Sequence, residues 1–96
     1  MELNLKNKVA LVTGSGRGIG ASMVRAFAGE GARVVVSDID GANAAATAQA
    51  LKDDGFDAIG VECDVTDASS VRHMAQLAQQ AYGGVDILVN NAAWTK

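Results

Sequence analysis

Residues 13–20 form the segment Thr-Gly-Ser-Gly-Arg-Gly-Ile-Gly, which directly follows the apolar run Val9–Val12. Glycines between a strand and a helix let main-chain N–H groups approach a phosphate closely, because no Cβ stands in the way. The helix that follows adds unpaired N–H donors and a partial positive charge. This segment therefore predicts a turn that binds the pyrophosphate of a dinucleotide. The residues expected to do so are Gly14, Ser15, Gly16, Arg17, Gly18, Ile19 and Gly20.

The spacing of the glycines narrows the kind of site. Gly14, Gly18 and Gly20 fit the pattern Gly-x-x-x-Gly-x-Gly. The general fingerprint Gly-x-Gly-x-x-Gly fails from Gly14, because position 19 is isoleucine, and it fits only weakly from Gly16 with Ala21 in the last place. No Gly-Lys-Ser/Thr follows, which excludes a P-loop.

Asp38 and Arg17 bear on the choice between NAD and NADP. Asp38 ends the expected strand 32–38, where a carboxylate can accept hydrogen bonds from the 2′-hydroxyl of the adenosine ribose. It would repel a 2′-phosphate ~4 Å away by several kcal/mol before relaxation and screening. Arg17 favours that phosphate, because an arginine in the turn can pair with it. No second basic residue follows Asp38, so NAD(H) is the favoured cofactor and NADP(H) the alternative.

Composition limits the remaining classes. With 96 residues, 49% hydrophobic and 20% charged, the chain can form one small globular domain at most. A net charge of −3 argues against a nucleic-acid or anionic-membrane surface. We expect a cytoplasmic protein, because no apolar stretch could span a membrane and no signal-peptide core is present. Cys63, the single cysteine, is expected to be a buried structural thiol, and no metal site is expected.

Strand and helix patterns alternate along the chain without a linker or a repeat. Strands are expected at 8–13, 32–38, 58–63 and 85–89, and helices at 18–29, 41–54 and between Asp67 and Gly83. The apolar faces of the first two helices are predicted to hold Ile19, Met23, Ala26 and Phe27, and Ala44, Ala48 and Leu51, respectively. The order βαβαβαβ predicts a parallel sheet with right-handed crossovers and helices on both faces.

In an open parallel sheet, ligands bind beyond the carboxyl ends of the strands, where the strand order switches. Besides the glycine turn, the segments that leave those ends are Ser37–Ile39, Asp64–Val65 and Asn90–Ala93. These segments are mostly small, polar or acidic, which suits a nucleotide. They are therefore further candidates for the dinucleotide site.

Three motifs together resemble the short-chain dehydrogenases/reductases: the Thr-Gly-x-x-x-Gly-Ile-Gly turn, then Asp64-Val65, then Asn90-Asn91-Ala92-Ala93. The resemblance covers the whole chain, and Ala93 stands where that family usually has glycine. It implies an α/β fold, a partial Rossmann-like doubly wound parallel sheet, with residues 1–96 as the N-terminal portion of one NAD(P)-binding domain. It also implies that Asp64 and Val65 border the adenine and that Asn90 and Ala92 line the adenine–ribose side.

The resemblance implies hydride transfer between nicotinamide and an alcohol or carbonyl carbon, with a tyrosine moving the proton and a lysine four residues later lowering its pKa. The only tyrosine is Tyr82, and Asp86 stands four residues on, so no catalytic residue is assigned. Tyr82 is instead expected to be a packing residue. The chain by itself is expected to be inactive.

Family members run well over twice this length. We therefore expect a piece of a longer enzyme, or a chain that forms homo-oligomers through the open edge of its fourth strand. The favoured function is an NAD(H)-dependent oxidoreductase acting on a small-molecule alcohol or carbonyl substrate. The alternatives are an NADPH-dependent reductase similar to 3-oxoacyl-acyl-carrier-protein reductases and a catalytically inert nucleotide-binding module. A methyltransferase is disfavoured by the glycine spacing and by Asn90-Asn91.

Overall fold

The computed structural model describes residues 4–92, so Ala93 lies outside the described residues. The elements follow in the order β1 (Val9–Val12), α1 (Gly18–Gly29), β2 (Arg33–Asp38), α2 (Gly41–Asp53), β3 (Ala58–Glu62), α3 (Ala68–Tyr82) and β4 (Ile87–Val89). Each predicted element is present. The largest difference between the predicted and observed bounds is at β4, which begins two residues later than expected. Within residues 4–92, no helix combines the length and the apolar character needed to cross a bilayer.

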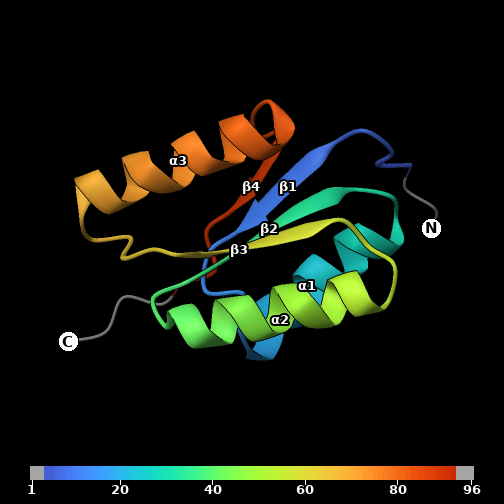
Figure 1. Ribbon diagram of the computed structural model, residues 1–96, viewed down its shortest axis with the longest axis horizontal. Helices are drawn as coiled ribbons and strands as arrows, with labels where there is room; N and C mark the ends of the chain where they lie inside the picture. Colours follow the sequence, from blue (N-terminus) through green and yellow to red (C-terminus); the bar gives the residue numbers. More distant parts are fainter. Residues whose placement is uncertain (1–3, 93–96) are drawn as a thin grey trace.

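The strands form one parallel sheet in the order β3-β2-β1-β4. Figure 1 shows α3 on one face of the sheet and α1 and α2 on the other. The expected doubly wound arrangement is therefore confirmed. The chain adds β2 and β3 on one side of β1 and then crosses to place β4 on the other side. This reversal next to β1 is the switch point at which open α/β sheets bind ligands.

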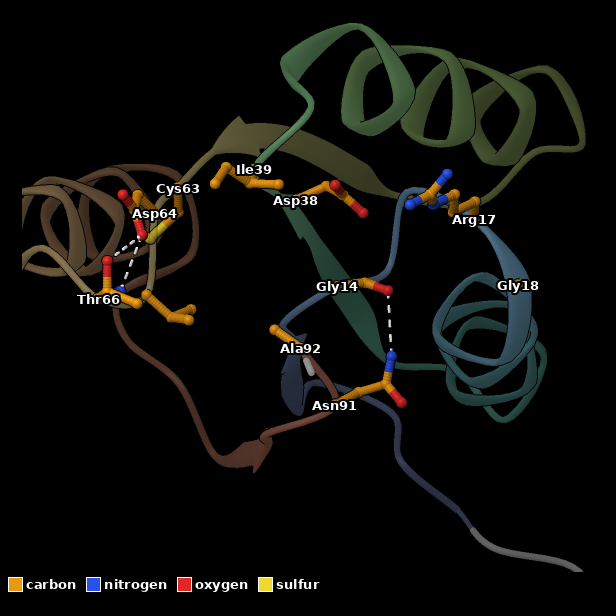
Figure 2. A pocket seen from close by; sticks show the side chains of 11 residues that line it. Gly14, Arg17, Gly18, Asp38, Ile39, Cys63, Asp64, Thr66, Asn91 and Ala92 are labelled. Carbon is orange, nitrogen blue, oxygen red and sulfur yellow. Dashed lines mark hydrogen bonds between the residues drawn. The ribbon is translucent and has the colours of Figure 1, made fainter. Parts of the chain in front are cut away.

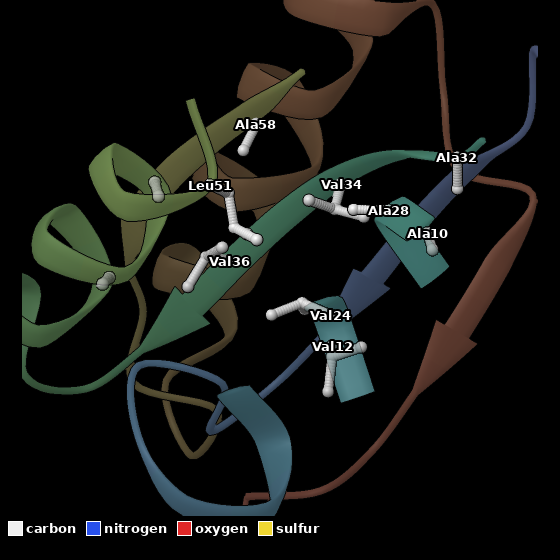
Figure 3. Packing of buried hydrophobic residues seen from close by; sticks show 11 residues of the cluster. Ala10, Val12, Val24, Ala28, Ala32, Val34, Val36, Leu51 and Ala58 are labelled. Atoms are coloured by element: carbon white, nitrogen blue, oxygen red, sulfur yellow. The ribbon is translucent and has the colours of Figure 1, made fainter. Parts of the chain in front are cut away.

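The α1 and α2 helices pack on their face of the sheet through small side chains. Val24 and Ala28 of α1 and the predicted face of α2 contact alternate residues of β1 and β2, which Figure 3 shows in close-up. The close approach of α2 to the sheet is evident at Gly60 of β3, where a Cβ would lie 2.7 Å from the carbonyl oxygen of Ala44. Small residues thus bring the start of α2 close to the ends of β2 and β3.

The apolar face predicted for α1 is correct only in part, because Met23 and Phe27 pack against the core whereas Ile19 and Ala26 do not. Its buried residues are Gly20, Val24 and Ala28, while Ile19 is 76% exposed. Met23 and Phe27 only flank this buried stripe, and Ala26 is exposed. The helix turns the stripe Gly20, Val24 and Ala28 toward the sheet, and it leaves the larger Ile19 outside.

The other face of the sheet is covered by α3 through Met74 and Ala78. Asp67 caps the start of this helix, and its carboxylate accepts hydrogen bonds from the amides of Ser69 and Ser70. The hydroxyl of Ser69 and these amides lower the pKa of Asp67 below its usual range. The α3 cap therefore holds a carboxylate that is ionised at neutral pH.

Tyr82 lies at the end of α3, near the amino ends of the strands. It is partly buried against the α3-side core, and its hydroxyl donates a hydrogen bond of 2.8 Å to Oδ1 of Asp57. The Arg33 guanidinium stands 5.2 Å from the centre of its ring. Burial, followed by the bond to Asp57, raises the pKa of Tyr82. These contacts describe a packing residue.

Candidate functional site

A cavity of about 790 Å³ opens at the carboxyl ends of the strands. Figure 2 shows segments from four parts of the chain meeting around it. Its lining residues are Gly14, Arg17, Gly18, Asp38, Ile39, Cys63, Asp64, Val65, Thr66, Asn91 and Ala92. The cavity therefore lies where the sequence predicts the dinucleotide site.

The glycine turn has backbone conformations and close contacts that require glycine. Gly14 and Gly18 have φ angles of +63° and +61°, in the left-handed region that side chains disfavour. A Cβ on Gly14 would lie 2.9 Å from Cα of Ala92. A Cβ on Gly20 would lie 2.6 Å from Nδ2 of Asn91 and closer still to the carbonyl oxygen of Gly14. The turn is thus pressed between the start of α1 and the segment after β4.

Two hydroxyl groups bind this turn to the neighbouring strand ends. Ser15 is fully buried, and its Oγ donates to the carbonyl of Val12 at 2.6 Å and accepts from the amide of Ser37 at 3.0 Å. On the other side, Oγ1 of Thr13 accepts from the amides of Asn91 and Ala92 at 3.0 and 3.1 Å. These bonds fix the glycine turn before any ligand arrives.

Asp38 is the buried acid of the cavity, only 6% exposed. Its Oδ2 accepts a hydrogen bond of 3.0 Å from the amide of Gly16, and its Oδ1 accepts one of 2.9 Å from the amide of Asp40. An ionised carboxylate has about four acceptor positions, so two backbone donors leave capacity for a ligand's hydroxyl groups. Asp38 is therefore held in one orientation at the cavity wall and can accept further hydrogen bonds.

The start of α1 supplies the positive part of the site. No side chain caps this helix at Arg17, and its first turn contains no acidic residue. The amides of the first turn and the exposed Arg17 therefore provide donors and positive charge for an anion. Together with the glycine turn, which leaves no Cβ in the way, these residues fit the pyrophosphate of a dinucleotide.

The segment after β3 closes the far wall of the cavity. Oδ1 of Asp64 accepts from Oγ1 of Thr66 at 2.7 Å and from the amide of Thr66 at 2.9 Å. The Thr66 hydroxyl, and after it the Thr66 amide, lowers the pKa of Asp64 below its usual range. Cys63 is buried, as expected, but also forms part of the cavity wall. This wall is thus a hydrogen-bonded turn that begins with an ionised carboxylate.

The predicted site residues fall into two groups. The cavity lining includes Gly14, Arg17, Gly18, Asp38, Ile39, Asp64, Val65 and Ala92. Outside that lining lie Ser15, Gly16, Ile19, Gly20 and Asn90. Ser15, Gly16 and Gly20 are buried behind the turn, where they shape it, while Ile19 and Asn90 are exposed.

Two lining residues, Cys63 and Thr66, fall outside every segment predicted for the dinucleotide site, while Asn91 lies inside the predicted segment 90–93 without an assigned role. The spacing Asp64-x-Thr66 is a usable signal, because aspartate commonly accepts hydrogen bonds two residues on. Nδ2 of the Asn91 side chain donates a hydrogen bond to the carbonyl oxygen of Gly14 at 3.1 Å. That contact joins residues 77 positions apart and leaves no local pattern.

Comparisons with known proteins agree with this geometry. The family model described as short chain dehydrogenase matches residues 8–96. Galactitol 2-dehydrogenase of Agrobacterium fabrum is 47% identical over 91 residues, which cover 95% of this chain and 34% of that protein. The chain thus spans about a third of the length of this curated relative.

Two solved structures are also similar. A hydroxysteroid dehydrogenase from Escherichia coli superposes with a TM-score of 0.92 at 40% identity, covering 97% of this chain and 40% of the other. A short chain dehydrogenase/reductase from Burkholderia phymatum, solved in complex with NAD, gives a TM-score of 0.85 at 34% identity, covering 90% and 31%. With the fold, the glycine turn and the matched family model in agreement, the chain belongs to the short-chain dehydrogenase family.

Proposed function

We propose that this chain is the dinucleotide-binding portion of an NAD(H)-dependent oxidoreductase that acts on an alcohol or carbonyl substrate. The observation that carries the proposal is Asp38, a buried carboxylate fixed at the cavity wall beside the glycine turn. Its free acceptor positions suit the hydroxyl groups of the adenosine ribose and disfavour a 2′-phosphate. The proposal places the pyrophosphate at the start of α1 and the adenine near Asp64 and Val65. Asn90 and Ala92 complete the adenine–ribose side.

The relatives support this choice of chemistry. One solved relative was determined with NAD, and one curated relative is a dehydrogenase of a sugar alcohol by its name. A bound nicotinamide would accept or supply the hydride, while the residues described here bind and orient the dinucleotide. Tyr82 is at the opposite end of the sheet with its hydroxyl held by Asp57, so it is not proposed to move a proton in this site.

A second candidate is an NADPH-dependent reductase, which Arg17 favours. Arg17 is exposed at the cavity wall, where its guanidinium could pair with a 2′-phosphate. Asp38 opposes this alternative, because the same wall carries a buried carboxylate. Arg17 therefore favours NADPH, whereas Asp38 favours NADH.

Calorimetric titration of the chain with NADH and, in parallel, with NADPH separates these candidates. We expect NADH to bind at least ~10-fold more tightly, a difference of about 1.4 kcal/mol, because the fixed Asp38 carboxylate disfavours the phosphate. Tighter NADPH binding would transfer the assignment to the reductase. Binding of neither dinucleotide would refute the proposed role of this chain.

We further propose that residues 1–96 form the N-terminal portion of a single Rossmann-type domain and that, in the 96-residue chain by itself, the outer edge of β4 associates with a second copy. In the part of the chain that the structure describes, β4 pairs only with β1, and Leu88 on this strand is 58% exposed. An apolar edge with unpaired backbone groups favours pairing with another strand.

Replacing Leu88 with lysine tests this association. A charge on the edge disfavours strand pairing, so we expect wild type to sediment as a dimer or larger species and the variant to sediment as a monomer. Val71→Lys on α3 is the matched control, because it exchanges another exposed apolar residue away from the edge. Concentration-independent monomeric sedimentation of wild type would contradict the proposal.

A further inference from the structure

Gly16 is held from both sides of its peptide, although it lies behind the cavity wall. Its amide donates to Oδ2 of Asp38 at 3.0 Å, and its carbonyl oxygen accepts a hydrogen bond of 2.8 Å from Oγ1 of Thr47. Thr47 belongs to the second turn of α2 and is separated from Gly16 by 31 positions in the chain. The glycine turn, the end of β2 and α2 are therefore joined at one residue.

The space around Gly16 shows how tightly these segments meet. A Cβ on Gly16 would lie 2.8 Å from Cβ of Asn43, 2.9 Å from Oδ2 of Asp38 and 3.0 Å from the amide nitrogen of Ala44. No side chain can be accommodated there without movement of α2 or of the carboxylate. The orientation of Asp38 thus depends on where α2 holds the Gly16 peptide.

The bond made by Thr47 is unusual for a threonine within a helix. Such a hydroxyl commonly donates to a carbonyl three or four residues earlier in its own helix. Here Oγ1 of Thr47 donates across to another segment, and Thr47 is partly buried. The hydroxyl therefore links two segments instead of satisfying itself locally.

We propose that Thr47 is a positioning residue that sets the preference for NADH over NADPH by fixing Gly16 and, through it, the carboxylate of Asp38. The inference rests on the proposed function, in which Asp38 accepts the ribose hydroxyls. With Thr47 in place, the carboxylate keeps one oxygen on Gly16 and the other on Asp40 and presents its remaining acceptor positions to the ribose. Without it, the Gly16 peptide is released, and the carboxylate can turn away from the ribose hydroxyls.

Thr47→Val removes the hydroxyl and keeps the branched shape, and Thr47→Ser keeps the hydroxyl. We expect Thr47→Val to weaken NADH binding about fivefold, the value of one neutral hydrogen bond, and to leave NADPH binding within about twofold. The dissociation constant for NADPH divided by that for NADH therefore falls in the valine variant. In the serine variant this ratio returns to the wild-type value. If the valine variant binds both dinucleotides equally more weakly, or if the ratio stays unchanged for any other reason, the proposal is overturned.

Hydrogen exchange without ligand gives a second readout that does not depend on dinucleotide binding. The Gly16 amide is expected to exchange about fivefold faster or more in Thr47→Val, while the amides of β1 and β2 keep their protection. Unchanged exchange at Gly16 also overturns the proposal. If the wild-type chain binds neither dinucleotide, the proposed function is refuted. If the wild-type chain prefers NADH and Thr47→Val does not change that preference, only the role of Thr47 is refuted.

Discussion

Replacing Gly20 with alanine is expected to lower the free energy of unfolding by about 3 kcal/mol and to weaken NADH binding more than ~10-fold. The added Cβ would stand 2.6 Å from Nδ2 of Asn91 and 2.8 Å from Cα of Ser15, and closer still to the Gly14 carbonyl oxygen. Because two of these three atoms belong to the backbone, the clash can be relieved only by moving the turn. Chemical denaturation and calorimetric titration measure the two effects.

Gly29→Ala is the matched control, because it makes the same exchange in the same helix. Nothing lies within 4 Å of a Cβ at Gly29, and this residue ends α1 away from the cavity. Alanine is a better helix former than glycine, so stability should rise by up to ~1 kcal/mol with no change in binding. A Gly20→Ala chain as stable as wild type would show that the turn is not as closely packed as described.

Replacing Asp38 with asparagine is expected to weaken NADH binding by ~10- to 100-fold and NADPH binding far less. The amide group cannot accept at both of its ends, so either the Gly16 or the Asp40 amide loses its partner, at a cost of about 1–3 kcal/mol. The loss of negative charge also removes the repulsion of a 2′-phosphate. Parallel titrations with both dinucleotides measure the change in selectivity.

Asp40→Asn controls for the loss of one negative charge close to the cavity. Asp40 caps α2 by accepting from the amide of Asn43, and asparagine serves equally well at that position. The preference of the Asp40→Asn variant for NADH over NADPH should therefore stay near that of wild type. If Asp40→Asn changed the ratio as much as Asp38→Asn, general electrostatics and not the fixed carboxylate would determine the preference.

The order of elements and the place of the cavity could be predicted from the sequence because their signals are local. Glycines after an apolar strand indicate a phosphate-binding turn, and the carboxyl ends of parallel strands meet at one edge. Asp38 could be singled out for the same reason, since it ends the second apolar run. The structure adds that its carboxylate is anchored by two backbone amides.

The orientation of α1 could not be predicted in this way. Hydrophobicity favours burial of Ile19, yet the close packing of the helix on the sheet buries Gly20, Val24 and Ala28. The spacing of four between these residues is visible in the sequence, but their fit becomes decisive only once the helix lies on β1. Steric fit here outweighs the hydrophobicity of a single side chain.

The contacts that hold the cavity walls were also beyond local patterns. Thr47 reaches Gly16 across 31 positions, and Asn91 reaches Gly14 across 77. Each is an ordinary polar residue whose partner is determined by the packing of α2 on β2 or of β4 beside β1. Such long-range bonds follow from the complete fold.

The most direct test of the account is to map where NADH binds, using amide chemical shifts of the labelled chain. We expect NADH to shift the amides of the glycine turn, Asp38–Ile39 and Asp64–Thr66, which surround the large cavity. The small hollow at the opposite end of the sheet, formed in part by Tyr82 and Gly83–Asp86, serves as the internal reference and should not respond. Shifts confined to that opposite end, or none with NADH in excess, would contradict the assignment of the dinucleotide site.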